Sequence, residues 1–172
     1  MSVRGEYLGM ALSIDDLDGE NLAYFKHCSE HQFHLQRCDD CSLLRYPPTT
    51  ACPWCASPRA TWTPVEGKGE VHSYEEVHHA IQPQFKGHTP YLVLLVELDA
   101  QKGTPTQDEG LRVIGNLTTP DGALAQPEMV ERVGIGSRVR MVFTDVAPGL
   151  SLPQWTIDEA AAQGAKVWRY PG

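Results

Sequence analysis

The sequence has no long apolar run. Its longest apolar stretch, Tyr91 to Val96, has the length of one strand, whereas a membrane-spanning helix needs about 20 apolar residues. The N-terminus also lacks a basic start followed by an apolar segment, which is the pattern of a secretory signal peptide. These two absences predict a soluble, cytoplasmic protein with no membrane partner.

Basic residues are also few. The 172-residue chain carries 14 Lys and Arg against 22 Asp and Glu, a formal net charge of −8. A zinc ribbon or small β-barrel that binds nucleic acid normally presents a basic face, because neutralising phosphates supplies most of the affinity. The charge balance therefore argues against a nucleic-acid partner. The sequence further lacks a GxGxxG motif after a strand and a phosphate-binding loop, so nucleotide hydrolysis and dinucleotide redox chemistry have no support.

Cysteine is scarce, yet four of the five cysteines stand in two CxxC pairs. Cys38 and Cys41 form the first pair, Cys52 and Cys55 form the second, and ten residues separate them. In a reducing compartment such pairs are metal ligands rather than disulfides. Two residues between cysteines let a tight turn aim both sulfurs at one ion, and four thiolates suit tetrahedral zinc. The spacing predicts a four-cysteine zinc site, with a single iron ion as the competing metal.

The expected role of this zinc is structural. Four protein ligands saturate the ion and leave no position for water or substrate. The metal therefore stabilises the fold of a module that is too small to be stable without it. One departure concerns Ser42 and Ala56, which follow the second cysteine of each pair, where backbone angles favour glycine. We expect the site to form with some strain. The fifth cysteine, Cys28, lies on the apolar face of a predicted helix and is interpreted as a buried small residue.

The chain after the cysteines is dominated by strand patterns. The hydrophobic period changes at a junction, which we place at Thr61 to Pro64 and the glycines of Gly67-Lys68-Gly69. A short helix over residues 127–133, with Pro127 at its first position, interrupts the strands that follow. Three strands, a helix and two strands is the order of an OB-fold barrel. The predicted strands span residues 70–81, 91–98, 111–117, 138–143 and 150–157.

The N-terminal region is less regular. Residues 1–13 show no sustained period, and a helix is predicted from about Asp16 to Ser29, with a short strand at Phe33 and Leu35 leading into the cysteines. The predicted fold is mainly β: an N-terminal helix, a four-cysteine zinc ribbon, and a five-stranded OB-fold barrel with one short helix between its third and fourth strands. The expected limits are 1–30 for the N-terminal segment, 31–64 for the ribbon, 65–157 for the barrel and 158–172 for a tail in which Trp168 docks on a neighbour.

Together these features resemble the OB-fold acyl-CoA-associated family with an N-terminal rubredoxin-like zinc ribbon. The resemblance covers roughly residues 16–157, and the order of its motifs makes it more specific than the cysteines alone. The matching stretches are Leu35-Gln36-Arg37-Cys38, Tyr46-Pro47-Pro48, Cys52-Pro53-Trp54-Cys55, Gly67-Lys68-Gly69-Glu70-Val71-His72-Ser73-Tyr74, Pro90-Tyr91-Leu92-Val93-Leu94-Leu95-Val96-Glu97-Leu98 and Gly136-Ser137-Arg138-Val139-Arg140.

The resemblance implies an accessory, non-catalytic subunit. Members of this family are typically small partners of thiolase-fold enzymes that act on acyl-CoA thioesters, such as thiolases, condensing enzymes and lipid-transfer-type aldolases, and some are fused to or assemble with enoyl-CoA hydratases. The implied catalytic residues belong to the partner chain, and two copies of each subunit in a heterotetramer is the expectation from two-fold symmetry.

The loop over residues 82–90 is the best candidate for contact with the partner or with coenzyme A. It joins two strands and carries an aromatic ring, a cation and a histidine, namely Phe85, Lys86 and His88. OB folds commonly bind through such loops, and Lys86 suits a CoA phosphate as a point charge. The alternative is a solvated hairpin connection. Other candidate phosphate contacts are Arg37, Arg45 and Arg59 in the metal segment.

Two other classes of function stay open. A single-stranded nucleic-acid module is possible for an OB barrel with a zinc ribbon, but it needs a basic groove with stacking aromatics, and the barrel strands carry many acids. The other class is a stand-alone acyl-CoA-binding protein or enzyme. The enzyme would need a catalytic group such as a histidine of the first barrel strand. His72, His78 and His79 are placed there, with His79 facing away from the other two, and no carboxylate is fixed beside them by the sequence.

Overall fold

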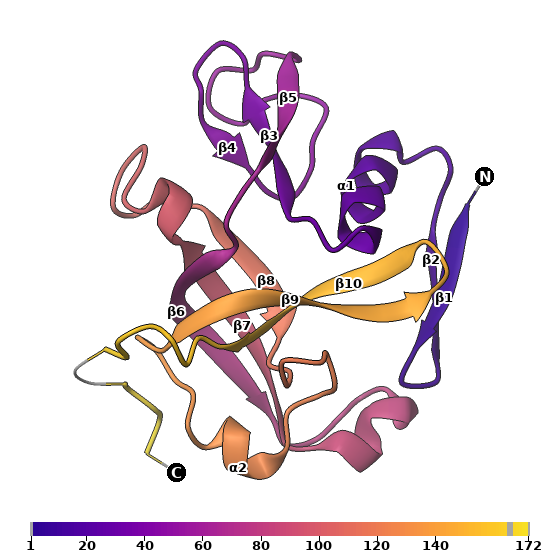
Figure 1. Ribbon diagram of the computed structural model, residues 1–172, viewed down its shortest axis with the longest axis vertical. Helices are drawn as coiled ribbons and strands as arrows, with labels where there is room; N and C mark the ends of the chain where they lie inside the picture. Colours follow the sequence, from indigo (N-terminus) through magenta and orange to yellow (C-terminus); the bar gives the residue numbers. More distant parts are fainter. Residues whose placement is uncertain (1, 165–166, 172) are drawn as a thin grey trace.

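The computed structural model describes residues 2–164 and 167–171. Within them the chain forms a two-stranded hairpin, a three-stranded sheet and a five-stranded sheet, with two α-helices and two short 3-10 helices between the strands (Figure 1). The fold is mainly β, as predicted. No helix in these residues is long and apolar enough to cross a membrane.

The five-stranded sheet closes into an OB-fold barrel, here called the barrel. Its strand order is β10-β9-β6-β7-β8, and every neighbouring pair is antiparallel. A parallel bridge between Leu117, just after β8, and Trp155 of β10 joins the two edges. The strands are β6 (Lys68–Val77), β7 (Tyr91–Leu98), β8 (Arg112–Asn116), β9 (Arg138–Ala147) and β10 (Leu150–Ile157), with helix α2 (Pro127–Val130) between β8 and β9.

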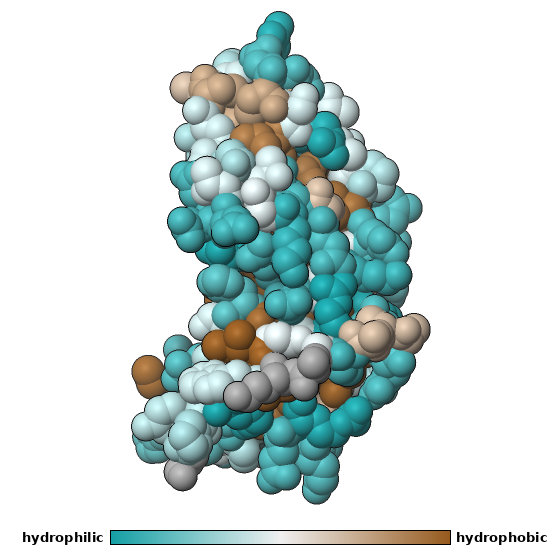
Figure 2. All heavy atoms as spheres, turned by 90° about the vertical axis from the view of Figure 1, so that its left-hand side faces the viewer, coloured by the Kyte–Doolittle hydropathy of each residue, from teal (hydrophilic) through white to brown (hydrophobic). Residues whose placement is uncertain are grey.

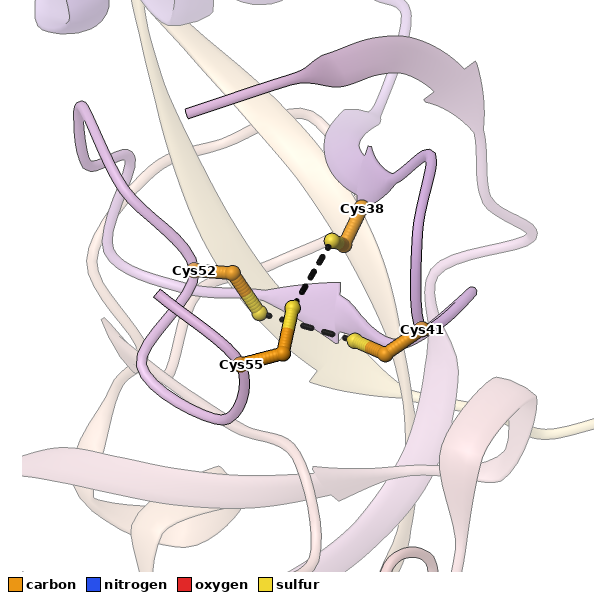
Figure 3. Close-up of side chains that lie close together, drawn as sticks. All are labelled: Cys38, Cys41, Cys52 and Cys55. Atoms are coloured by element: carbon orange, nitrogen blue, oxygen red, sulfur yellow. Dashed lines mark hydrogen bonds between the residues drawn. The ribbon is translucent and has the colours of Figure 1, made fainter. Parts of the chain in front are cut away.

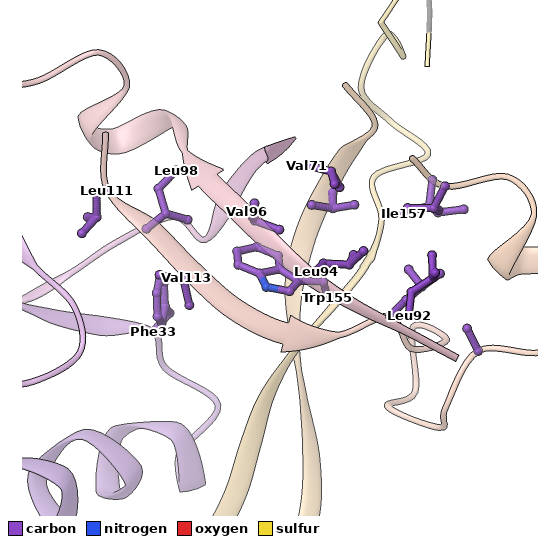
Figure 4. Close-up of a cluster of buried hydrophobic side chains, with 14 of the residues drawn as sticks. Phe33, Val71, Leu92, Leu94, Val96, Leu98, Leu111, Val113, Trp155 and Ile157 are labelled. Atoms are coloured by element: carbon purple, nitrogen blue, oxygen red, sulfur yellow. The ribbon is translucent and has the colours of Figure 1, made fainter. Parts of the chain in front are cut away.

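The barrel interior is apolar. Strand β7 alternates a fully buried residue with a half-buried one along its whole length, as expected for a pleated strand with one face on the core. Trp155 is fully buried and lies among the side chains of the neighbouring strands (Figure 4). Val130 of α2 and Val133 after it are buried at the end of the barrel (Figure 1). This core contains Val71, Leu92, Leu94, Val96, Leu98, Val113, Val139 and Ile157.

The three-stranded sheet, here called the ribbon, has the order β4-β3-β5. It is built from β3 (His34–Cys38), β4 (Leu44–Arg45) and β5 (Ala60–Pro64), all antiparallel. Strand β5 occupies residues that we interpreted as part of the junction; their pairing with β3 shows that the junction begins later, at Val65. Gly67, with φ of +65°, then turns the chain into the barrel.

A side-chain amide fastens the ribbon to the barrel. Gln101, in the 3-10 helix η2 (Asp99–Gln101) after β7, accepts a hydrogen bond from the backbone N–H of Leu44 at 2.7 Å and donates one to the Leu44 carbonyl at 3.1 Å. Both residues are buried. The amide thus satisfies the free edge of β4 as a neighbouring strand would, and it fixes the position of the ribbon on the barrel.

The N-terminal region contains a hairpin that the sequence did not predict. Strands β1 (Val3–Tyr7) and β2 (Met10–Ile14) pair through a two-residue turn, and both turn residues have positive φ: +52° at Leu8 and +82° at Gly9. This is the geometry of a type I′ turn, in which leucine is an unusual first residue, so the usual Asn-Gly signal is missing. Helix α1 (Gly19–Ser29) follows, capped by Asp18, whose carboxylate accepts from the backbone N–H of Asn21.

The tail docks on its own barrel. The backbone of Trp168 pairs with that of Ile135, while the indole is still 46% exposed. The guanidinium of Arg169 donates to the carbonyls of Val130 and Val133, pairs with Glu76 and lies over the ring of Tyr74.

Candidate functional site

The four paired cysteines converge on one point of the ribbon. Their sulfur atoms all lie within 4.8 Å of one another (Figure 3). Cys38 and Cys55 have sulfurs 3.5 Å apart, and Cys41 and Cys52 have sulfurs 3.6 Å apart, so each close pair joins one motif to the other. Four sulfurs about 2.3 Å from a central ion would be separated by about 3.8 Å, whereas a disulfide needs about 2.05 Å. The geometry fits one tetrahedral metal ion.

The two cysteine turns have the same backbone construction. In the first, the N–H of Ser42 donates to the Cys38 carbonyl and the N–H of Cys38 donates to Leu43. The second repeats both bonds, from Ala56 to Cys52 and from Cys52 to Ser57. Ser42 and Ala56 adopt φ of +65° and +59°. The predicted strain at these non-glycine positions is confirmed, because both residues occupy the left-handed region that glycine prefers.

Hydrogen bonding and crowding move the thiol pKa values in opposite directions. Backbone N–H groups, that of Cys41 foremost, lower the pKa of Cys38 to about 6. A backbone hydrogen bond from Ser57 acts in the same sense on Cys55, but the contacts with the other three cysteine sulfurs, Cys38 foremost, and desolvation together outweigh it and raise the pKa of Cys55 to about 12. Without a cation, four thiolates at this spacing repel one another, so the cluster is arranged to ionise around a metal.

Cys28 takes no part in this cluster. It is fully buried in helix α1, and burial raises the pKa of its thiol to about 12. A thiol that stays protonated is neither a nucleophile nor a metal ligand at neutral pH. Its interpretation as a buried small residue is confirmed.

The predicted binding loop lies on one wall of an apolar cavity. Residues 83–88 form the 3-10 helix η1 (Pro83–His88), which places Phe85, 8% exposed, against Tyr7 of the N-terminal hairpin. The cavity has a volume of about 600 Å³, and Met10 and Leu152 also line it. Lys86 and His88 are exposed and do not line it. The structure thus separates the three residues: one faces a cavity, and two face solvent.

The three histidines expected on the first barrel strand do not share that strand. Strand β6 ends at Val77, so His78 and His79 lie beyond it, and an extra residue at His72 interrupts the pairing with β7. Our prediction that all three share one alternating strand is therefore wrong, because a β-bulge and an early strand end break the period. His72 lies 3.7 Å from Glu97, and His78 lies 3.4 Å from Glu76.

One histidine contact could not be anticipated from the sequence. His31, just after α1, lies 2.7 Å from Asp145 of β9, and Ser151 of β10 donates to the same carboxylate oxygen at 2.6 Å. These hydrogen bonds lower the pKa of Asp145. Since the hydroxyl contacts the acid and not the imidazole, the group does not form a nucleophilic triad. It joins the end of α1 to the barrel.

A four-cysteine ribbon joined to an OB-fold barrel is therefore the class of protein that this fold and site define. A family model for the C-terminal OB-fold domain of ChsH2 matches residues 62–144. A solved structure described as the Ltp2-ChsH2(DUF35) aldolase contains a chain that is 30% identical, with a TM-score of 0.63 over 84% of this chain and 98% of that one. The chain belongs to the ChsH2, or DUF35, family, which confirms the resemblance drawn from the sequence.

Two further proteins are similar to this chain. A DUF35-family protein of unknown function from Sulfolobus solfataricus is 13% identical with a TM-score of 0.50, covering 81% of this chain and 86% of that one, and shows the shared fold. The "Probable enoyl-CoA hydratase alpha subunit" of Thermomonospora curvata is 34% identical over 139 residues, or 80% of this chain. The chain spans only 37% of the length of that relative.

Proposed function

We propose that this chain is an accessory, non-catalytic subunit of a heteromeric thiolase-fold enzyme, a thiolase or a lipid-transfer-type aldolase, that acts on acyl-CoA thioesters. The observation that carries the proposal is the likeness to a chain of the Ltp2-ChsH2(DUF35) aldolase. The match covers 98% of that chain and 84% of this one. Among the exposed histidines of the described residues, His31, His72 and His78 each lie beside a carboxylate, and the Ser151 hydroxyl near His31 bonds to the acid rather than to the imidazole. Catalysis is accordingly assigned to the partner.

The metal in this proposal is zinc, held by Cys38, Cys41, Cys52 and Cys55. A single iron ion in four thiolates has the same geometry, but zinc is preferred because it requires no redox function of this chain. All four ligand positions come from the protein, so the ion stabilises the ribbon and does not touch substrate. The ribbon and α1 then dock on the partner, and the barrel lies near its substrate entrance. The expected assembly is a cytoplasmic heterotetramer with two copies of each chain.

The CoA thioester would approach the barrel on the side of η1. Phe85 there lines the apolar cavity, while the exposed Lys86 and His88 are available to a phosphate or to the partner surface. Replacing Lys86 and His88 together with alanine should raise the KM of the assembled enzyme and leave kcat little changed, because remote phosphate contacts bind ground state and transition state alike.

Reconstitution of activity tests the main proposal. The zinc-loaded chain, a thiolase-fold aldolase from the same genome, and their mixture are each assayed for cleavage of acyl-CoA substrates. We expect turnover only in the mixture, or a large increase over the aldolase alone. Equal activity with and without this chain would refute the accessory role, and turnover by this chain alone would favour the stand-alone enzyme.

A second candidate follows from the Thermomonospora curvata relative, whose name includes a hydratase subunit. The chain would then serve an enoyl-CoA hydratase, either as a separate subunit or as part of a longer chain. Adding a hydratase subunit in place of the aldolase distinguishes the two, because only the true partner will form a complex and gain activity. Tight retention of an oligonucleotide at low salt would instead revive the nucleic-acid alternative, which the net charge of −8 opposes.

A further inference from the structure

A cleft of about 270 Å³ lies where the ribbon meets the barrel. Its ribbon side is formed by β4 and the second cysteine turn, and its barrel side by η2 and the start of β8. The loop between β7 and β8 reaches toward β4 (Figure 1), and this side of the molecule presents a largely hydrophilic surface (Figure 2). The cleft borders the second cysteine turn through Pro53 and Trp54 but contains none of the four cysteines, and it shares no lining residue with the cavity beside Phe85.

A buried arginine without an acidic partner lines this cleft. Arg45 is 3% exposed; its Nε donates to the Gln36 side chain at 2.9 Å and its Nη2 donates to the Thr49 carbonyl at 2.9 Å. Its Nη1 is buried and has no hydrogen-bond partner among the described residues. The nearest acid of this network, Glu20, bonds to the amide of Gln36 and not to the guanidinium.

An isolated buried cation of this kind calls for an anion. Charged groups are buried only at considerable cost unless an opposite charge or a full set of hydrogen bonds compensates them. In the described part of the chain no carboxylate lies within salt-bridge distance of Arg45, although other arginines such as Arg59, Arg138 and Arg169 each pair with an acid. Arg45 is therefore a buried arginine whose charge no carboxylate of the described residues balances.

The barrel side supplies a second arginine. Arg112 lies 3.5 Å from Glu97 and donates to the Asp108 carbonyl at 3.3 Å, but its Nε is also buried without a partner among the described residues. Trp54, 40% exposed, lines the same cleft from the ribbon. The cleft thus combines two guanidinium groups with an indole, a set that suits a phosphate group carried by a planar ring.

The walls of the cleft are fixed by the Gln101 amide, which also lines it and holds η2 to Leu44. Two acids oppose anion binding. Glu97 pairs with Arg112, and Glu109 lines the cleft, is exposed, and accepts a hydrogen bond from Thr106 at 2.9 Å. An exposed carboxylate is well solvated and can turn away, so it weakens the attraction for an anion without cancelling it.

We propose that this cleft binds a phosphate group of a small molecule, with Arg45 and Arg112 as its cationic walls and Trp54 as the surface for an attached ring. The ligand class is a nucleotide-like phosphate ester. The cleft lies beside η2 at one end of β7, whereas η1 lies at the other end, so this site is separate from the CoA contact proposed at Lys86 and His88. Binding there would join ribbon and barrel through a ligand that touches both.

Isothermal titration of the zinc-loaded full chain tests this proposal. The probes are adenosine 3′,5′-bisphosphate, pyrophosphate and inorganic phosphate, which separate a ring-bearing phosphate from a free one. We expect the adenosine compound to bind more tightly than either inorganic anion. Arg112→Gln should weaken its binding by about tenfold, the loss expected for one charged hydrogen bond. Trp54→Ala should weaken only the adenosine compound, and Glu109→Gln should tighten all three.

Arg132→Gln is the matched control, because Arg132 is an exposed arginine outside the cleft that pairs with Glu159, and its replacement should leave all affinities unchanged. Arg45→Gln is measured together with zinc content, and Arg112→Gln decides the matter if that variant loses its metal. Absence of heat with every probe at millimolar concentration, or affinities that Arg112→Gln and Trp54→Ala leave unchanged, would overturn the proposal. Neither result would affect assembly with a thiolase-fold partner, so the two failures are distinguishable.

Discussion

The ribbon and the barrel differ in what fills their interiors. The barrel has an apolar core drawn from all five strands, with Trp155, Leu94 and their neighbours fully buried. The ribbon buries only Leu35 and Leu44 among its large apolar side chains, and two of its other buried residues are the ligands Cys38 and Cys52. A module with so few buried apolar groups needs another source of stability. The comparison teaches that the cysteine cluster, with the metal proposed for it, takes the place of a core in the ribbon.

The largest expected effect is loss of the metal. Cys38→Ser should release zinc and unfold the ribbon, because metal binding contributes about 10 kcal/mol or more to such modules. Hydrogen exchange should then rise over residues 34–64 while residues 68–157 stay protected. Zinc content and exchange by mass spectrometry check both statements.

Cys28→Ala provides the control for that experiment, since Cys28 is a buried cysteine outside the cluster. It should keep its zinc in full. A Cys38→Ser protein whose ribbon amides remained protected would contradict the claim that the metal replaces a core.

The second-largest effect is expected from a substitution in the apolar core of the barrel. Leu94→Ala removes a fully buried side chain and should lower the free energy of unfolding by about 3 kcal/mol. The zinc content should not change, because the metal site lies in the other region. Denaturant unfolding gives the free energy. Ile114→Ala, at a position 53% exposed on β8, should cost far less; equal losses at both sites would show that the barrel core is not the main source of stability.

The third effect concerns the join between the two regions. Gln101→Ala removes both hydrogen bonds to Leu44 and leaves buried backbone groups unpaired, at a cost of about 2 kcal/mol. We expect faster hydrogen exchange at the Leu44 amide, with zinc retained. Gln84→Ala, at an exposed glutamine, serves as the control. Unchanged exchange at Leu44 would mean that Gln101 does not hold the ribbon in place.

The smallest expected effect is an increase in the stability of the ribbon. Ser42→Gly and Ala56→Gly should each stabilise the ribbon by about 0.5 kcal/mol, the relief of a left-handed conformation less the added freedom of the unfolded chain. Thermal resistance to proteolysis within the ribbon measures the change. Ala51→Gly, outside the left-handed region, should bring no gain. Destabilisation by both glycines would show that the two turns are not strained.

The sequence was informative where one pattern decides the structure. Strands β7 and β10 were predicted at their observed limits, 91–98 and 150–157, because burial on the barrel interior dominates their composition. The spacing alone predicted that the four cysteines would come together, and the residues after Cys41 and Cys55 adopt the backbone angles expected there.

Other features depend on contacts between distant residues. The hairpin of β1 and β2 was missed because Leu8 occupies a turn position that usually carries asparagine or glycine. The His31 contact with Asp145 spans 114 residues, and the Gln101 contact with Leu44 spans 57, so no local pattern reports them. The exposure of Lys86 and the burial of Phe85 likewise depend on how η1 packs against the hairpin.

The most direct test of the central claim is the mass of the complex with a thiolase-fold partner, measured by size-exclusion chromatography with light scattering. The zinc-loaded chain should elute with that partner at the mass of a heterotetramer, and the Cys38→Ser chain should elute apart from it. Separate elution of the wild-type chain and the partner, or normal assembly by the zinc-free variant, would contradict an accessory subunit that docks through its metal ribbon.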